Sequence, residues 1–245
     1  MRKRKISKRK CTLFALLIIF TVGLFSYVGA MNNNRNIYYV LADTHVTETE
    51  PIEKTNEVLE LREYYNNSDI QGKLVIAGTG INEPILKGSD NYYYLNHNAY
   101  GNYQAEGSVY EDYRTNFGDR KVLIFGHSSP GWDVPFNELE KYYDKSFYDS
   151  HKYIEIIAED KTYKYEIFSV YVETSDYTYM NLLIDDETYK NYLKRYQDMS
   201  FYDTKVKVND DDHILILQTC SNKSEYQKYE KKYLLVIAKE IREVK

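Results

Sequence analysis

Between Lys73 and Lys239 the chain is a series of short apolar segments separated by polar turns, and this spacing limits the possible folds more than any other feature of the sequence. Short segments rich in β-branched and aromatic side chains are typical of strands and too brief for helices. Such segments lie at 74–76, 84–86, 107–110, 121–125, 153–157, 163–172, 206–208, 214–217 and 233–239. We therefore expect a mainly β fold, either a closed barrel or a sandwich.

Three other stretches have helical patterns. Ile52 to Asn66 has apolar residues on one side and charged residues on the other, which predicts an amphipathic N-terminal helix. Pro135 to Tyr148 opens with proline, which suits the first turn of a helix. Asp186 to Met199 opens with acidic residues, which suit the positive end of the helix dipole. We expect this last helix to be inserted between two late strands.

The N-terminus predicts a membrane anchor. Residues 1–10 carry seven Lys and Arg side chains, and the uncharged, mostly apolar run 11–30 follows them. A run of about 20 such residues spans a bilayer, and a basic flank stays in the cytoplasm. We expect a cytoplasmic tail at 1–10, a transmembrane anchor at 11–30, a spacer at 31–51 and an extracytoplasmic domain at 52–245. The alternative is a secretory signal cleaved after Ala30, for which the apolar run is long.

The part of the chain beyond this anchor is acidic. Without the seven N-terminal basic residues, 25 Lys and Arg face 37 Asp and Glu, a formal charge of −12. Such a surface repels polyphosphate, and no glycine-rich phosphate loop follows a strand. We therefore expect no nucleic-acid partner and no nucleotide chemistry, and we expect neither a metal nor a cofactor.

Cys220 ends the apolar strand that begins at Ile214, and it is the only cysteine besides Cys11 in the predicted anchor. A cysteine at a strand end can be wetted and ionised, whereas one buried in mid-strand is usually inert packing. An unpaired thiol is unusual in an exported domain, where thiols tend to be oxidised. These observations favour a nucleophile over a packing residue.

A thiol nucleophile needs a base or a cation nearby, and histidine is the natural partner. His127 follows the strand 121–125, so it also stands at a strand end, and the preceding Gly126 permits a close approach of backbone. His97 lies in a loop and is a weaker candidate, with a place in substrate binding. The remaining histidines, His45, His151 and His213, are most simply surface residues.

Four segments carry a resemblance to a known family. They are Glu106 to Asp112, the turn Phe125 to His127, Glu140 to Tyr148 and Leu217 to Cys220, and the last of these, Leu-x-Thr-Cys at a strand end, is the most specific. Together they resemble the class B sortases over about residues 55 to 245. The resemblance implies the sortase β-barrel and a cysteine transpeptidase in the plasma membrane of a Gram-positive bacterium, with its catalytic domain on the outer face.

The resemblance also implies an activity and a set of partners. A sortase cleaves a sorting motif near the C-terminus of a secreted protein through a cysteine thioester. It then joins the new end to an amine, such as that of a peptidoglycan precursor or a pilin lysine. Cys220 matches the family nucleophile and His127 the family histidine, and Thr219 and Ser221, beside the thiol, are expected to contact the substrate.

At the third position of the family's site this sequence departs from the pattern. The family has an arginine at the start of the last strand, where it binds the substrate carbonyl or the oxyanion, whereas this chain has Tyr233 there, after Lys232. No arginine lies between Cys220 and Arg242. Lysine lacks the planar fork of arginine, and the loss of one oxyanion donor costs about 10²- to 10³-fold in rate. We expect Lys232 or Tyr233 to act as the substitute.

Two alternatives from other functional classes stay open. The missing arginine is compatible with a sortase-like surface protein that binds without catalysis. A secreted cysteine protease that hydrolyses without joining is the second alternative. A thioester on Cys220 would exclude the first, and product analysis with an added amine would separate the second from a transpeptidase.

Overall fold

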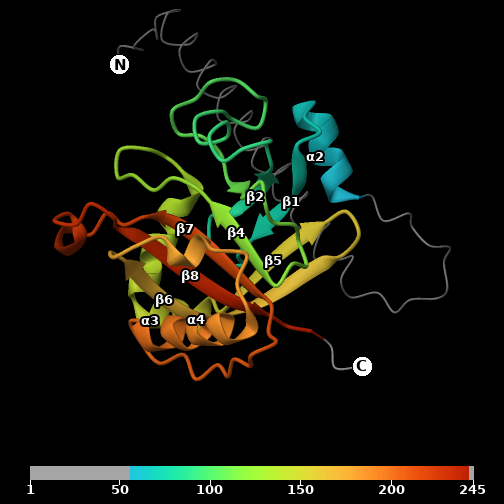
Figure 1. The fold of residues 1–245 in the computed structure, drawn as a ribbon. Helices are drawn as coiled ribbons and strands as arrows, with labels where there is room; N and C mark the ends of the chain where they lie inside the picture. Colours follow the sequence, from blue (N-terminus) through green and yellow to red (C-terminus); the bar gives the residue numbers. More distant parts are fainter. Residues whose placement is uncertain (1–55, 243–245) are drawn as a thin grey trace, which may run out of the picture. The chain divides into compact units, whose positions relative to one another are not determined.

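The computed structural model describes residues 56–242, and within this range eight strands close into a barrel (Figure 1). Their order around the barrel is β1-β2-β3-β4-β7-β8-β6-β5. The strands are β1 (Ile70–Val75), β2 (Asn82–Leu86), β3 (Tyr110–Glu111), β4 (Lys121–Phe125), β5 (Tyr153–Ala158), β6 (Thr162–Glu173), β7 (Ile214–Cys220) and β8 (Tyr233–Glu240). The prediction of a closed β-barrel with added helices is confirmed.

Strands β4, β7 and β8 are buried on both faces, which explains why they are continuous apolar runs in the sequence. Alternate residues face the barrel interior, and the residues between them face an outer apolar layer. Ile124, Leu217 and Val236 belong to the interior cluster. Phe125, Ile216 and Leu235 belong to the outer cluster. Each strand therefore has an inner side and an outer side, and any residue at a strand end can be assigned to one of them.

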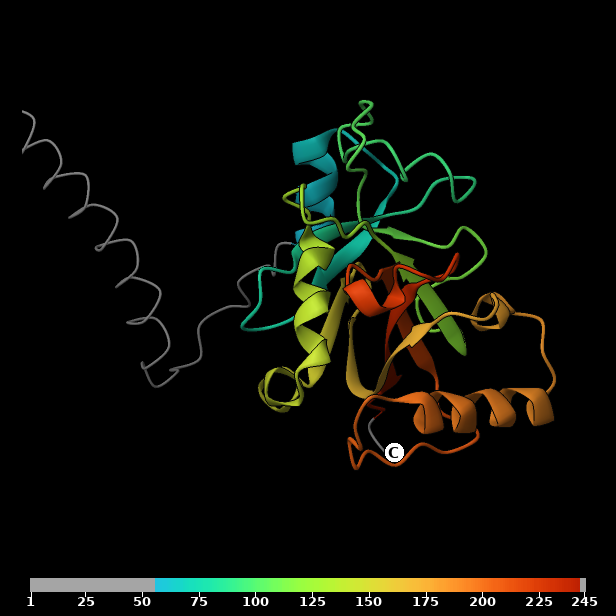
Figure 2. The same cartoon turned by 90° about the vertical axis from the view of Figure 1, so that its left-hand side faces the viewer.

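Helices cover the barrel at separate places. Helix α2 (Glu57–Tyr65) packs on β1 and helix α4 (Asp186–Met199) on β6. Figures 1 and 2 show these two helices at opposite ends of the barrel domain. The 3-10 helix η1 (Pro135–Tyr143) and the short α3 (Lys145–Ser150) run along one side of the barrel, as Figure 2 shows. Two more 3-10 turns, η2 (Thr178–Met180) and η3 (Ser224–Tyr226), lie in the connections before α4 and before β8.

The predicted helices are confirmed with changes in two of them. Helix α4 has the predicted bounds, and α2 begins at Glu57, where the Asn56 side chain caps it. The stretch 135–148 is divided at Asp144, whose carboxylate accepts a hydrogen bond from the Ser146 N–H at 2.8 Å. Asp144 therefore ends the first segment and caps the second, because its backbone is extended and not helical.

The expected strand at 206–208 was wrong. Val206 and Val208 are half-buried and pack on the outer apolar layer, and neither pairs with a strand. Their alternation thus reflects one-sided packing of an extended segment. The strand expected at 107–110 begins later, since β3 is Tyr110–Glu111 and residues 107–109 belong to no strand. Gly107 adopts a positive φ of 59°, and the Ser108 N–H donates to the Tyr94 carbonyl of the preceding loop.

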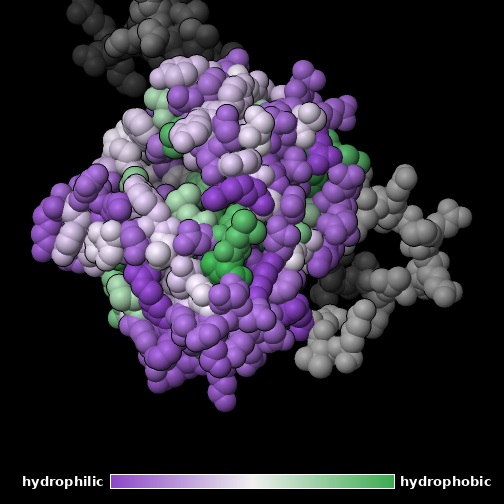
Figure 3. All heavy atoms as spheres, viewed as in Figure 1, coloured by the Kyte–Doolittle hydropathy of each residue, from purple (hydrophilic) through white to green (hydrophobic). Residues whose placement is uncertain are grey.

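Polar side chains cover most of the face shown in Figure 3, with only small apolar patches between them. Leu183, in the connection before α4, is fully exposed. Between residues 56 and 242 no helix is long and apolar enough to cross a membrane. The predicted tail, anchor and spacer at 1–51 lie outside the described residues.

Candidate active site

The pairing of β4 with β7 brings His127 and Cys220 to one edge of the barrel. These strands are parallel, with Phe125 opposite Gln218, and the Gly126 N–H donates to the Gln218 carbonyl at 3.2 Å. Cys220 ends β7 two residues after Gln218, and His127 lies two residues after Phe125, just past the end of β4, so both lie at this edge. Neighbouring strands are about 4.8 Å apart, and alternation along β7 puts Cys220 on its outer side. The register therefore brings the two strongest candidates from the sequence to the same edge of the barrel.

The thiol of Cys220 is free and half-buried. Burial raises its pKa above the ordinary value, while the positive charge of Lys232 lowers the pKa and the Glu140 carboxylate raises it. Burial is the largest of these effects. At neutral pH most of the molecules therefore carry a neutral thiol, and a nearby cation is needed to hold the thiolate.

A loop from the opposite side of the site positions His127. Its Nε2 lies 2.9 Å from the carbonyl oxygen of Leu95, in the loop between β2 and β3. Because a carbonyl only accepts hydrogen bonds, Nε2 must carry a proton here. The ring also meets Trp132 edge-on, with 5.6 Å between ring centroids. The contacts with Leu95 and Trp132 fix the orientation of the ring.

Hydrogen bonds join the segment after Cys220 to the segment after His127. The Asn222 side-chain amide donates to the Ser128 hydroxyl oxygen at 2.7 Å, and the Ser128 hydroxyl donates to Asn137 at 3.0 Å. The Asn222 N–H donates to the Glu140 carboxylate at 2.9 Å. Sequence reasoning assigned none of these residues a role, since Ser128 and Asn222 look like ordinary polar turn residues and Asn137 and Glu140 look like polar residues of the predicted helix. Their one signal was the position of Asn222 and Ser128 directly after a candidate strand end.

Thr219 and Ser221, the predicted substrate contacts beside the thiol, are both buried. Thr219 lies on the inner side of β7, away from Cys220, and its hydroxyl finds no hydrogen-bond partner among residues 56–242. The Ser221 hydroxyl lies 2.6 Å from the Tyr143 hydroxyl, and the Ser221 N–H donates to the Lys232 carbonyl at 2.7 Å. Ser221 therefore fixes the start of the β7–β8 connection. A substrate contact of either residue stays a prediction.

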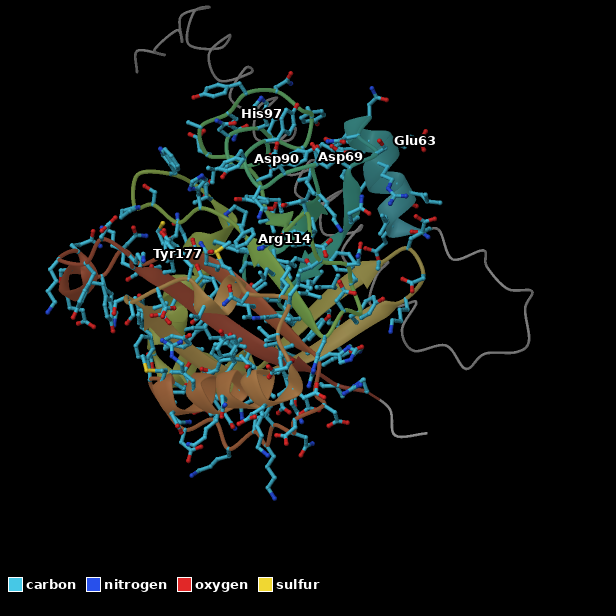
Figure 4. All side chains as sticks on the ribbon, viewed as in Figure 1. Glu63, Asp69, Asp90, His97, Arg114 and Tyr177 are labelled. Carbon is cyan, nitrogen blue, oxygen red and sulfur yellow. The ribbon has the colours of Figure 1, made fainter. Side chains whose placement is uncertain are left out.

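Tyr233 is the residue of β8 directly opposite Cys220. Its side chain packs on the outer layer, and its hydroxyl oxygen lies 3.0 Å from that of Tyr177. Figure 4 shows Tyr177 on the connection that follows β6. The Lys232 ammonium donates to the Gln227 side-chain oxygen at 2.5 Å. Tyr233 and Lys232 are thus both close to Cys220, in different surroundings.

The loop before β3 holds His97 internally. Its Nδ1 lies 2.7 Å from the Tyr93 carbonyl oxygen, and its ring stacks on the Tyr93 ring with 4.0 Å between centroids. Figure 4 shows His97 on this loop, well separated from Tyr177. The structure does not bring His97 to the thiol, and its contact with substrate stays a prediction.

A cavity of about 320 Å³ adjoins His127. It is lined by residues of β2, of the loop before β3 and of the start of η1, and it includes Glu83, Tyr100 and Asp133. His127 is therefore within reach of a molecule in this cavity. In the described part of the chain, no group of three or more His, Cys, Asp and Glu is placed to hold a metal ion.

Comparisons with known proteins identify the family of this chain. The family model described as a sortase domain matches residues 74–241. Sortase B from Listeria monocytogenes is 32% identical over 234 residues, which cover 90% of this chain and 95% of that protein. The solved structure of the Listeria protein superposes with a TM-score of 0.63 over 74% of this chain and 99% of its own. A Staphylococcus aureus sortase B–substrate complex, 29% identical, superposes with a TM-score of 0.67 over 77% of this chain and 86% of its own.

Proposed function

The chain belongs to the sortase family of cysteine transpeptidases, and on this premise we propose that it is a membrane-anchored transpeptidase of a Gram-positive cell surface, with Cys220 as its nucleophile. The supporting observation is the parallel register of β4 and β7, which brings Cys220 and His127 to one edge of the barrel. A half-buried thiol at the open end of a strand can meet a peptide carbonyl, whereas a thiol in mid-strand cannot.

The first half of the reaction forms a thioester. The Cys220 thiolate attacks the scissile carbonyl carbon, and the negative charge moves to the carbonyl oxygen. When the tetrahedral intermediate collapses, the C–N bond breaks and the departing amine takes a proton from the His127 imidazolium. The products are an acylated Cys220, a neutral His127 and the released C-terminal peptide.

The second half transfers the acyl group to an amine. A primary amine attacks the thioester carbonyl, neutral His127 takes the proton that the amine loses, and the C–S bond breaks. An amide forms, and Cys220 and His127 return to thiolate and imidazolium. Attack by water in place of the amine would give simple hydrolysis. The outcome therefore depends on whether the amine or water reaches the thioester first.

The substrates are secreted proteins with a sorting motif near their C-terminus. One relative of similar fold, the S. aureus sortase B, has been solved in complex with a substrate. The acceptor is a cell-wall amine, that of a peptidoglycan precursor or of a pilin lysine. The cavity beside His127 offers room for this second molecule next to the group that takes its proton.

The location follows from residues 1–30. Seven basic residues precede an uncharged run long enough to span a bilayer, which supports an N-terminus in the cytoplasm and a sortase domain outside. Protease added to wall-stripped cells should degrade the domain and spare a short N-terminal fragment. Release of the whole domain into the medium without residues 1–30 would overturn the anchor.

Mass spectrometry of the enzyme with a library of sorting-motif peptides tests the reaction. We expect a mass increase on Cys220 equal to the acyl part of the peptide, and no increase in Cys220→Ala. Addition of an amine should convert the thioester to an amide product faster than water hydrolyses it. Peptide binding without any thioester would favour the non-catalytic alternative, and hydrolysis unchanged by amines would favour the protease.

A further inference from the structure

The scissile carbonyl needs a hydrogen-bond donor beside Cys220, and the hydroxyl of Tyr233, one of the two substitutes expected from the sequence, is paired there with the hydroxyl of Tyr177. Tyr233 faces Cys220 across the β7–β8 ladder, and the hydroxyl oxygens of Tyr233 and Tyr177 are 3.0 Å apart. We propose that Tyr233 donates this hydrogen bond to the developing oxyanion and that Tyr177 is a positioning residue that orients the Tyr233 hydroxyl. This inference rests on the proposed function, because it takes Cys220 as the nucleophile.

The geometry of β8 turns Tyr233 toward the site. Leu234 and Val236 face the barrel interior, whereas Leu235 and Ile237 face the outer layer. Tyr233 continues the outer set, to which Cys220 also belongs, so both side chains lie on one face. Burial, the largest cause, and the charge of Cys220 raise the pKa of Tyr233 well above its ordinary value. The hydroxyl therefore stays protonated and can donate.

Two paired hydroxyl groups orient a hydrogen-bond donor better than one hydroxyl alone. The pair has two O–H protons, and only one of them can lie between the two oxygens. When Tyr177 donates to Tyr233, the proton of Tyr233 is free for a third atom. A hydroxyl that accepts one hydrogen bond is polarised and becomes a stronger donor in the next. Tyr177 thus directs the Tyr233 proton away from itself and toward the carbonyl.

Several contacts hold the segment that carries Tyr177. The Lys121 ammonium donates to the carbonyls of Tyr179 and Asn181 at 2.8 and 2.7 Å. The Tyr179 hydroxyl donates to the Gln218 side chain, in β7, at 3.0 Å. Tyr177 itself packs under the Lys231 ammonium, which lies 4.5 Å from its ring centroid. The hydroxyl is therefore presented from a fixed segment, as orientation of a donor requires.

Lys232 has a different task. Its ammonium is bonded to the Gln227 side-chain oxygen, and the Gln227 side-chain amide donates in turn to the Ser221 carbonyl at 3.0 Å. These bonds tie Lys232 to the β7–β8 connection. Its charge lowers the pKa of Cys220 against the effect of burial. Lys232 thus favours the thiolate through its charge, whereas the tyrosine pair serves the oxygen of the substrate.

Two reactions of the same thiol separate these effects. Acyl transfer from p-nitrophenyl acetate forms an oxyanion, whereas alkylation by iodoacetamide forms none, and neither reagent needs a sorting motif. We expect Tyr233→Phe to slow acylation about 10²-fold and Tyr177→Phe about tenfold, with alkylation unchanged in both. The double variant should be no slower than Tyr233→Phe, because Tyr177 acts through Tyr233. Tyr153→Phe, an exposed tyrosine of β5, is the matched control and should match the wild type.

Each other result has a definite meaning. Equal losses of rate in acylation and alkylation would mean that the tyrosine pair acts on the reactivity of the Cys220 thiol, and this would overturn the inference. Independent losses that add up in the double variant would overturn the positioning role of Tyr177. The wild type could react with the ester in a way that depends on Tyr233 and yet not react with any peptide. This result would support the role of the tyrosine pair and overturn the proposed substrate class. A Cys220 that reacts with neither reagent would overturn both proposals.

Discussion

The two ends of the β4–β7 ladder carry ionisable groups in contrasting settings. At the end where both strands stop lie His127 and Cys220, half-buried and next to solvent. At the other end Lys121, opposite Ile214, is 5% exposed, and its ammonium donates to two backbone carbonyls. Burial displaces the pKa of a group at both ends, upward for Cys220 and down to about 7 for Lys121.

The difference between the two ends lies in what satisfies each group. The hydrogen-bonding capacity of Lys121 is taken up by the protein, so this end anchors the η2 segment. The thiol of Cys220 is unpaired and open to a reactant. A displaced pKa alone therefore does not identify a reactive group. We expect substitutions at the open end to change the rate and substitutions at the closed end to change stability.

The largest expected effect is that of Cys220→Ala. Thioester formation should be lost, because no other cysteine lies in the described chain, while the melting temperature should stay close to that of the wild type. The exchange removes one sulfur atom from a half-buried site, which costs about 1 kcal/mol or less. Thermal unfolding and mass spectrometry of the same sample check both statements. A large loss of stability would mean that Cys220 is a packing residue, and the two ends of the ladder would then not differ in function.

His127→Ala should lower the acylation rate by about 10²- to 10⁴-fold, because the departing amine loses its acid. The wild type needs a thiolate together with an imidazolium, so its rate should have a bell-shaped pH dependence that belongs to the pair. In His127→Ala only the thiolate requirement remains. The residual rate should then rise with pH to a plateau as the raised pKa of Cys220 is passed. If His127→Ala kept a near-normal rate and a bell-shaped pH dependence, the pairing of His127 with Cys220 would be refuted.

Asn222→Ala should lower acylation by roughly 10- to 100-fold, since the bond to Ser128 couples the two segments of the open end. The loss of one hydrogen bond costs only about 1 kcal/mol of stability. Asn191→Ala, on the exposed side of α4, is the matched control and should leave both quantities unchanged. Alkylation of Cys220 should stay near the wild-type rate, since the thiol itself is untouched. An unchanged acylation rate would mean that the strands alone align the pair.

The sequence is sufficient to predict the site residues that lie at strand ends. Runs of β-branched residues predict β4 and β7, and Cys220 and His127 follow directly from where these runs stop. The paired residues are different. Asn222 and Ser128 are 94 positions apart in the chain, Tyr177 and Tyr233 are 56 apart, and Lys121 and Tyr179 are 58 apart. Their contacts depend on strand register and on loop paths, which leave no periodic pattern.

The smallest effect on rate is expected at the closed end. Lys121→Met should slow acylation only a few-fold, through a looser η2 segment, because Lys121 lies at the far end of the ladder. Its effect on stability should depend on pH. The pKa of Lys121 falls from 10.5 to about 7 on folding, since burial and the nearby Arg114 disfavour its charge. Between these values the unfolded chain binds the extra proton, so the fold gains stability as pH rises.

Denaturant unfolding at pH 7 and pH 9 measures directly how the free energy of unfolding changes with pH. The wild type should gain about 2 kcal/mol relative to Lys121→Met over this interval, because one proton separates the two states for most of it. The exposed Lys207 has no such burial, so Lys207→Met should follow the wild type at both pH values. Parallel behaviour of Lys121→Met and the wild type would mean that Lys121 keeps its charge in the fold. The closed end would then hold η2 through an ammonium ion, and the contrast between the ends would rest on hydrogen bonding alone.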